Sequence, residues 1–181
     1  MIKQNEKGFS LIELMMVIAV SSIIMYALAT TMLKGNEQID STALRMDIQE
    51  SAREGLYKMT QEIRQSAPTR VVIAGTGNSV QLSVPDPANP VLADYTVNWA
   101  GSRSISYALG GVNNRQLIRT DLGTNQARVV ANDVTAVNFA GNSANPTLVT
   151  ITISVQRTMI NGKVIPVTPL QLVAQAEVRN A

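Results

Sequence analysis

Glu13 is the residue whose position first invites a chemical explanation. It is the only charged side chain between Phe9 and Leu33, in a stretch that reads EKGFSLIELMMVIAV from Glu6 to Val20. An acidic side chain deep in an apolar, membrane-length segment costs about 2.5–3.5 kcal/mol on insertion scales. We therefore expect another group to neutralise the carboxylate of Glu13.

Residue types that commonly support catalysis are missing. The sequence contains no cysteine and no histidine, so it has no thiolate nucleophile, no disulfide framework and none of the commonest zinc ligands or general bases. A Ser–Lys or carboxylate-pair enzyme remains possible in principle, but no motif supports one. The sequence favours a protein that is not an enzyme, with no catalytic residue, no cofactor and no bound metal.

Two short motifs elsewhere invite a binding site. Gly75 and Gly77 suggest a phosphate loop, yet no Gly-Lys-Ser/Thr follows and no helical pattern begins there, which favours turn glycines. Asp86 and Asp94 border a proline-rich segment and suggest a calcium site, but they lack the spacing of a calcium loop. A solvated surface loop is the favoured interpretation of residues 85–94.

The apolar run from Phe9 to Leu33 predicts a helix roughly 37 Å long, enough to cross a bilayer core of about 30 Å. Lys3 and Lys7 precede it, which predicts a cytoplasmic N-terminus and export of the rest. One interpretation is a secretory signal peptide cleaved after the Ala-Leu-Ala of residues 27–29. Another is a plain membrane anchor. Both leave Glu13 unexplained.

A third interpretation accounts for Glu13. The segment KGFSLIELMMVIAV resembles the N-terminal signature of type IV pilins and pseudopilins, the class III prepilin signal. The resemblance implies that a prepilin peptidase cuts between Gly8 and Phe9 and N-methylates Phe9. It also implies that Glu13 pairs with the Phe9 amine of a neighbouring subunit during assembly. A buried carboxylate and a buried ammonium are each costly alone and tolerable together.

Residues 36–66 predict an amphipathic helix that continues the apolar one. Gly35 and Gly55 are its weak points, each costing up to about 1 kcal/mol relative to alanine, and Gly35 is a candidate hinge. Thr30 stands where many major pilins have a proline, so the helix melting linked to that proline is not carried over. We expect its apolar stripe to pack on the chain's own sheet; the stripe comprises Ile39, Leu44, Ile48, Ala52, Leu56, Met59 and Ile63.

Beyond Pro68 the pattern changes to alternating β-branched residues separated by turn residues. Asn161-Gly162 is the strongest hairpin signal. The predicted fold is α+β: a long N-terminal helix, half transmembrane and half amphipathic, packed on a C-terminal antiparallel β-sheet head. The expected divisions are a leader (1–8), a transmembrane assembly helix (9–34), an amphipathic helix (35–67) and the head (68–181). The predicted strands are 70–74, 79–84, 95–99, 103–109, 115–120, 127–131, 134–140, 147–156 and 170–178.

The order of these strands resembles that of W-type minor pilins and of J-type pseudopilins from type II secretion systems. Residues 51–66 and the closing AEVRNA are also similar to W-type components. The resemblance implies a minor pilin-like subunit that primes or caps a pilus, with the J-type pseudopilin as the alternative. The implied partners are other pilins or pseudopilins, the prepilin peptidase and an inner-membrane assembly platform driven by a cytoplasmic ATPase. The protein would reside in the inner membrane before assembly, and in a periplasm-spanning or extracellular filament afterwards.

Three other interpretations stay open: a major pilin, a membrane-anchored binding module, and a periplasmic protein released at Ala29. The net charge is only +2, which gives little reason to expect a nucleic-acid partner, and no motif indicates a small-molecule substrate. A binding module would require the basic side chains of the head to cluster on one face. These are Arg70, Arg103, Arg115, Arg119, Arg128, Arg157, Lys163 and Arg179.

Overall fold

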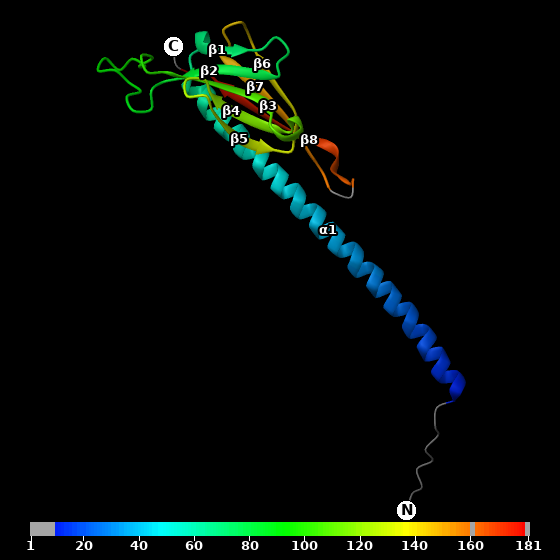
Figure 1. Cartoon of the computed structure of the whole chain (residues 1–181). Coiled ribbons are helices and arrows are strands. Elements are labelled where there is room, and N and C mark those ends of the chain that lie inside the picture. The colour runs from blue at the N-terminus through cyan, green and yellow to red at the C-terminus, as the bar shows by residue number, and fades with distance from the viewer. Residues whose placement is uncertain (1–9, 160–161, 180–181) are drawn as a thin grey trace, which may run out of the picture. The chain divides into compact units, whose positions relative to one another are not determined.

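The computed structural model describes residues 10–159 and 162–179. One long helix, α1, is followed by two short 3-10 turns and eight strands (Figure 1). The described chain forms two compact units, and the division between them falls between Ala43 and Leu44, within α1. The α+β class predicted from the sequence is confirmed.

Helix α1 spans Leu11–Gln65 without interruption, consistent with the absence of proline before Pro68. Its most apolar 18-residue window has a mean hydropathy of 2.3, and by length and composition α1 is able to cross a membrane. Gly35 does not break it, and an added Cβ there would meet nothing within 4 Å.

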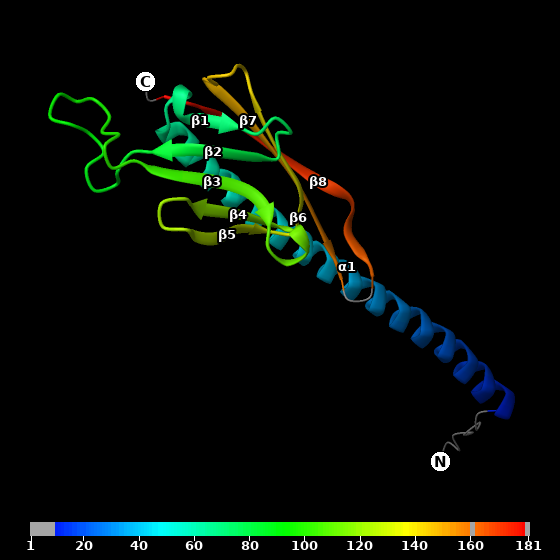
Figure 2. The ribbon, with the colours of Figure 1, turned by 45° about the horizontal axis from the view of Figure 1, so that its top comes forward.

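The strands form two antiparallel sheets, where the sequence predicted one. The first has five strands in sequential order (Figure 2): β1 (Val71–Ile73), β2 (Ser79–Val84), β3 (Arg103–Gly110), β4 (Gln116–Asp121) and β5 (Gln126–Asn132). The second has the order β6 (Val134–Gly141), β7 (Leu148–Thr158), β8 (Val164–Glu177). Asp133 stands between the two sheets with a φ of 58°, and this left-handed residue redirects the chain from β5 into β6.

The C-terminal part of α1 belongs to the core of the head. From Ile48 onward the predicted apolar stripe is buried, Leu44 is half-buried, and Ile39 is 67% exposed. The inward-facing residues of the strands complete the core with period two, as in β7, where Val149, Ile151, Ile153 and Val155 are all buried. The prediction that the stripe packs on the chain's own sheet is therefore confirmed, except at Ile39.

Gly55 has a packing role that the sequence did not reveal. A Cβ on Gly55 would stand 3.1 Å from the Cβ of Ala131 and 3.3 Å from the carbonyl oxygen of Val130. The glycine therefore lets α1 approach β5 closely.

Two strand predictions were wrong. Residues 95–99 form no strand; they lie in the long connection between β2 and β3, where the single pairing is an isolated bridge between Val91 and Val97. Strand β8 begins at Val164, six positions before the predicted start at Leu170, because Val164 and Ile165 pair with Thr158 and Arg157. Pro166 lies within β8, which is an edge strand of its sheet, where proline is tolerated.

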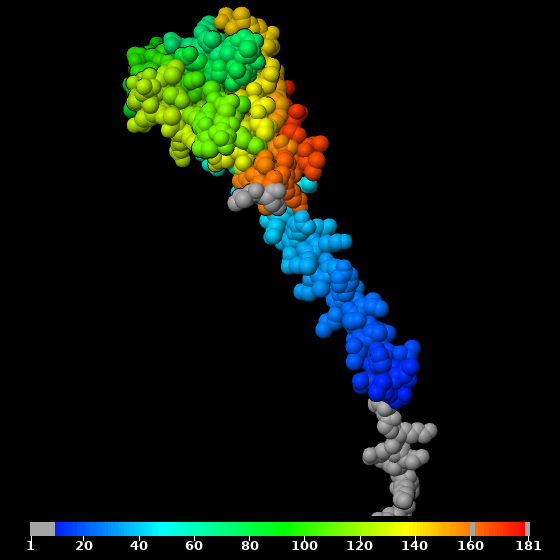
Figure 3. Space-filling model, turned by 45° about the vertical axis from the view of Figure 1, so that its right-hand side comes forward, coloured from blue at the N-terminus to red at the C-terminus, as the bar shows by residue number. Residues whose placement is uncertain are grey.

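The hairpin predicted at Asn161-Gly162 is confirmed by the antiparallel pairing of β7 with β8. Gly162 has a φ of 79° and donates its N–H to Met159, while Asn161 lies outside the described residues. The two strands lie together on the surface of the head in space-filling view (Figure 3).

Candidate functional site

The residues predicted to carry function lie at the N-terminus. Gly8 and Phe9, the expected cleavage and methylation positions, lie outside the described residues. Glu13 lies in the first turn of α1 and is exposed. It borders a shallow groove of about 290 Å³ whose other lining residues are Met16, Val17, Val20 and Ser21. Glu13 is therefore the only Asp, Glu, Lys or Arg side chain on the apolar helical surface between Leu11 and Leu33.

Several other polar side chains of this segment are satisfied within the helix. The hydroxyl of Ser22 donates to the carbonyl of Ala19 at 2.8 Å, and the hydroxyls of Thr30 and Thr31 donate to Ala27 at 2.9 and 2.8 Å. Such back-bonding lets a hydroxyl enter a lipid environment at low cost. Among the described residues the carboxylate of Glu13 has no comparable partner, so a neutralising group has to come from outside this set.

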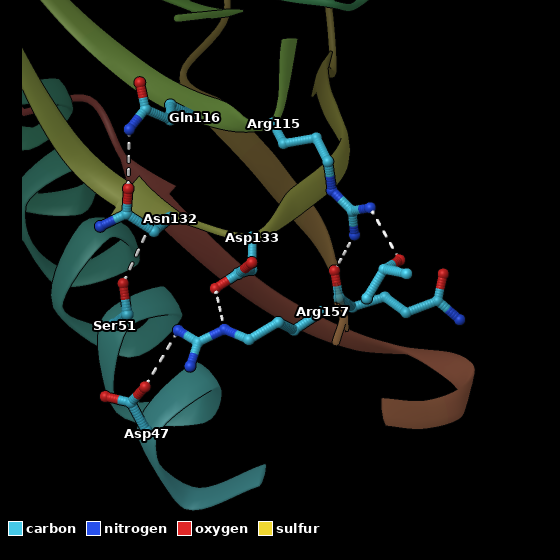
Figure 4. A network of polar contacts seen from close by, with 9 residues as sticks. Asp47, Ser51, Arg115, Gln116, Asn132, Asp133 and Arg157 are labelled. Atoms are coloured by element: carbon cyan, nitrogen blue, oxygen red, sulfur yellow. Dashed lines mark hydrogen bonds and ion pairs between the residues drawn. The ribbon is translucent and has the colours of Figure 1, made fainter. Parts of the chain in front are cut away.

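A second group of polar residues joins α1 to the head (Figure 4). Arg157 on β7 contacts two carboxylates: its Nε donates to Asp133 Oδ2 at 2.7 Å, and its Nη2 lies 3.0 Å from Asp47 Oδ2 on α1. Burial works against the charged guanidinium, but the hydrogen bond and charge of Asp133, assisted by Asp47, raise the pKa of Arg157 above its ordinary value. Arg157 thus links α1 to Asp133, the residue at which the chain passes from the first sheet to the second.

A neighbouring contact joins α1 to β5 through the backbone. The N–H of Asn132 donates to Ser51 Oγ at 3.1 Å, and the side chain of Asn132 accepts from Gln116 Nε2 at 2.9 Å. Arg115 points the other way in Figure 4, donating to the carbonyl of Gln156 and to Thr158 Oγ1. Six of the residues in these two groups help line an open cavity of about 440 Å³: Arg115, Gln116, Asn132, Asp133, Arg157 and Thr158. Asn132 and Arg157 contact the helix, whereas Arg115 bonds to β7, so this group acts as a structural junction.

A third polar group fixes the end of α1. The buried Tyr107 donates its hydroxyl to Glu62 Oε2 at 2.5 Å, and Arg119 Nε donates to Glu62 Oε1 at 2.9 Å. Burial, together with the negative charge of Glu62, raises the pKa of Tyr107 far above its ordinary value of 10. Tyr107 therefore keeps its proton and serves as a hydrogen-bond donor to the helix.

The two weaker motifs of the sequence have structural roles. Gly77 has a φ of 71° in the β1–β2 turn, and its carbonyl accepts from the N–H of Phe139 at 2.7 Å. The carboxylates of Asp86 and Asp94 accept hydrogen bonds from residues two positions ahead, Ala88 and Thr96. Within residues 10–159 and 162–179 no three His, Cys, Asp or Glu side chains gather as a metal site would require.

The basic side chains of the head come from different elements. Arg70 lies 4.5 Å over the ring of Trp99, Arg119 pairs with Glu62, and Arg157 pairs with Asp47 and Asp133. Sequence reasoning identified these arginines only as a possible patch. Their intramolecular partners lie far away in the chain, and no local signal indicated them.

Comparison with known proteins gives one match. Residues 3–29 match the family described as the prokaryotic N-terminal methylation motif. The matched segment includes Gly8, Phe9 and Glu13 and most of the apolar part of α1. No curated protein and no solved structure matches the chain.

Proposed function

We propose that this chain, whose methylation motif and long apolar helix are consistent with the type IV pilin superfamily, is a structural subunit of a pilus-like filament. The observation that carries the proposal is Glu13: a lone carboxylate on an exposed apolar helix, without a partner among the described residues, inside the matched motif. A subunit that assembles beside a neighbour's N-terminal amine would supply that partner.

The proposed sequence of events follows from this arrangement. The chain is held in the inner membrane by α1, with its N-terminus in the cytoplasm. The prepilin peptidase removes residues 1–8 and methylates the amine of Phe9. An assembly platform then transfers the subunit into the filament, where Glu13 pairs with a neighbour's Phe9 amine. Each subunit would join by a head-to-tail contact that does not close into a ring.

Replacing Gly8 tests the processing step. Gly8 has to be small because the peptidase approaches the scissile backbone closely. A Gly8→Val chain should accumulate at full length in the membrane, whereas a Gly8→Ala control should still be cut at least in part. Intact-mass spectrometry of the purified protein distinguishes the two forms. Maturation of Gly8→Val to a methylated Phe9 would refute the prepilin assignment.

The finer proposal is a minor, priming or capping subunit, with the J-type pseudopilin as the alternative. Its supports are a head of eight strands, the lack of the C-terminal cysteine pair found in many major pilins, and the strand order. A bulky head at a filament end escapes the packing demands made on every repeat of the shaft. The head would then act through contacts with a few other subunits.

Stoichiometry and deletion separate these roles. Quantitative mass spectrometry of sheared, purified filaments should find this chain rare relative to the dominant subunit. Deleting it should reduce the number of filaments and leave the structure of the shaft unchanged. If this chain makes up most of the filament mass, the minor role is wrong, although the filament role survives. Loss of protein secretion with normal surface pili would favour the J-type alternative.

A further inference from the structure

The connection between β2 and β3, residues 85–102, projects from the head (Figure 1) and is firmly anchored at its base. Asn98 is only 8% exposed, and its side-chain amide donates to the carbonyl of Asn89 at 2.9 Å. The N–H of Asn98 donates to Pro90, and its side-chain oxygen accepts from Ala100. Beside it, Trp99 carries the guanidinium of Arg70 on its ring. The base of the loop is thus fixed to the fold.

The tip of the loop is a closed turn. The N–H of Leu92 donates to Thr96 at 2.9 Å, and the N–H of Tyr95 donates back to Leu92 at 3.0 Å. Asp94 Oδ1 accepts from the hydroxyl of Thr96 at 2.6 Å and from its N–H at 3.1 Å. These bonds define the direction in which the tip presents its side chains.

Tyr95 lies at this tip in a strained backbone conformation. Its φ of 64° lies in the left-handed region, where a bulky side chain is strained and glycine or asparagine is normal. Its side chain is 91% exposed, the highest value among the large apolar side chains of the described residues, and Val91 and Leu92 beside it are also exposed.

The charge of the loop limits what can cover Tyr95. Between Val71 and Ser102 the sequence has two acidic residues, Asp86 and Asp94, while Arg70 and Arg103 flank the base of the loop and Arg70 lies on Trp99. The charge next to Tyr95 at the tip is therefore that of Asp94, which disfavours anionic lipid or nucleic acid there. A basic protein surface would be attracted by this carboxylate. Tyrosine itself suits a protein interface, because its rigid ring buries a large area with little loss of conformational entropy.

We propose that residues 85–102 form a docking finger whose Tyr95 ring enters an apolar socket, rimmed by basic side chains, on another protein subunit of the filament. This inference rests on the proposed filament role and adds the surface through which the head selects its neighbour. The strain at Tyr95 and the anchored base hold the ring ready for that socket before it binds.

Site-specific photo-crosslinking tests the contact in the full-length chain. The photoreactive aromatic residue p-benzoylphenylalanine replaces Tyr95 in cells that assemble filaments, and replaces Val167, which is 82% exposed on β8, in the control. Position 95 should crosslink to one defined filament subunit through a peptide that contains lysine or arginine, and Asp94→Lys should abolish that product. Crosslinking no stronger than at position 167, or to lipid, overturns the proposal.

Tyr95→Gly supplies the second readout. Glycine relieves the left-handed strain, so the thermal midpoint of the head should stay the same or rise. Recovery of the crosslinked subunit in co-purification should nevertheless fall at least about tenfold, while Tyr95→Phe should retain most of it. Unchanged recovery of the subunit with Tyr95→Gly, or a Tyr95→Gly head that no longer folds, would refute the docking-finger proposal.

Leader cleavage is measured in the same samples. Normal cleavage at Gly8 together with unchanged co-purification refutes the docking finger alone. A chain that is never cleaved at Gly8, even as wild type, refutes the filament role on which the finger rests.

Discussion

At the scale of single residues, acidic side chains in this protein differ by whether they have found a partner within the chain. Glu62 accepts hydrogen bonds from Tyr107 and Arg119, and Asp133 pairs with Arg157. Glu13 has none among the described residues. The first two stabilise the head, and the third is exposed on the apolar part of α1, where the proposed function assigns it a contact with another subunit.

Replacing Glu13 should separate membrane insertion from assembly. Glu13→Val should make insertion easier because it removes a carboxylate from an apolar helix, yet under the proposed pairing it would leave a neighbour's amine without its partner. The cleaved chain should therefore accumulate in the membrane, with filament incorporation reduced at least about tenfold by immunoblot of sheared filaments. Glu13→Gln keeps the shape of the side chain and should show a similar defect. Normal incorporation of both variants would contradict the pairing.

Asp121 should make the head sensitive to acid. The backbone N–H groups of Thr124 and Gly123 donate to its carboxylate and hold its pKa below the ordinary value of 3.8. A lowered pKa means that this stabilisation is complete above the unfolded-state pKa and is lost as pH falls through the folded-state pKa. Thermal unfolding between pH 7 and pH 3 should therefore show a decline below about pH 4.

The matched control is Asp121→Asn, whose amide oxygen accepts the same hydrogen bonds without titrating. Its unfolding midpoint should depend less on pH than that of the wild type, and Asp121→Ala should lower the midpoint already at pH 7. Parallel pH profiles for the wild type and Asp121→Asn would show that Asp121 is not responsible.

At the scale of elements, the main structural problem is the attachment of α1 to two sheets. Polar contacts fix its register at Asp47, Ser51 and Glu62, and buried apolar residues between them supply the contact area. These polar partners come from β3, β4, β5 and β7, so α1 is attached to both sheets.

The two ion pairs of Arg157, with Asp133 and with Asp47, should contribute unequally to the stability of this attachment. Arg157→Ala should lower the free energy of unfolding by about 1–2 kcal/mol, chiefly because Asp133, whose side chain is 20% exposed, loses its partner. Asp47→Asn should cost less than about 0.5 kcal/mol, because Asp47 is 63% exposed. Double-mutant cycles in urea should give a larger coupling energy for Arg157–Asp133 than for Arg157–Asp47. Equal coupling energies would contradict this ranking.

The two glycines of α1 should respond differently to the same substitution. Gly55→Val places its side chain against Val130 and Ala131 and should destabilise the head by about 1–3 kcal/mol. Gly35→Val meets nothing within 4 Å and should be close to neutral. Thermal unfolding of the detergent-solubilised chain, followed by circular dichroism, compares them. A neutral Gly55→Val would show that α1 and β5 do not need their close approach.

The sequence predicted the elements whose signals are local. The alternation in SVQLSV gave β2 with its observed bounds, and the missing prolines gave one continuous helix. Prediction from the sequence failed where contacts with distant segments determine the local structure. YTVNW has strand composition, yet the prolines that precede it and the turn at Tyr95 leave it in a loop. Likewise, the N-terminal signature identified Glu13 as a candidate functional residue. The partners of Arg157 and the exposure of Tyr95 depend on distant segments and could not be predicted locally.

At the scale of the whole molecule, the head and the second half of α1 are one folding unit, which begins at Leu44. Its core contains Ile48, Leu56, Met59 and Ile63 together with residues from both sheets. No residue between Leu11 and Ala43 belongs to that core. On the proposed function, anchoring and folding would therefore be assigned to different parts of one helix.

Truncation should reveal this division. A chain that starts at Gln38 should be soluble and unfold cooperatively, because it retains the whole unit from Leu44 onward. A chain that starts at Pro68 lacks the buried residues of α1, each large one contributing about 1.5–3 kcal/mol of burial, which together exhaust an ordinary stability of about 5–15 kcal/mol. It should be unfolded or aggregated. Size-exclusion chromatography and urea titration distinguish these outcomes, and a stable fragment from Pro68 would contradict the shared core.

The Arg157 contacts and the buried face of α1 also determine how the protein bears mechanical load. A pull on the N-terminal end is carried by the backbone of α1, whose residues Ile48, Ala52, Leu56, Met59 and Ile63 are buried in the core of the head. The chain has no cysteine, so no covalent crosslink shares that tension. The force at which α1 is extracted from the sheets is thus the tensile strength of the head.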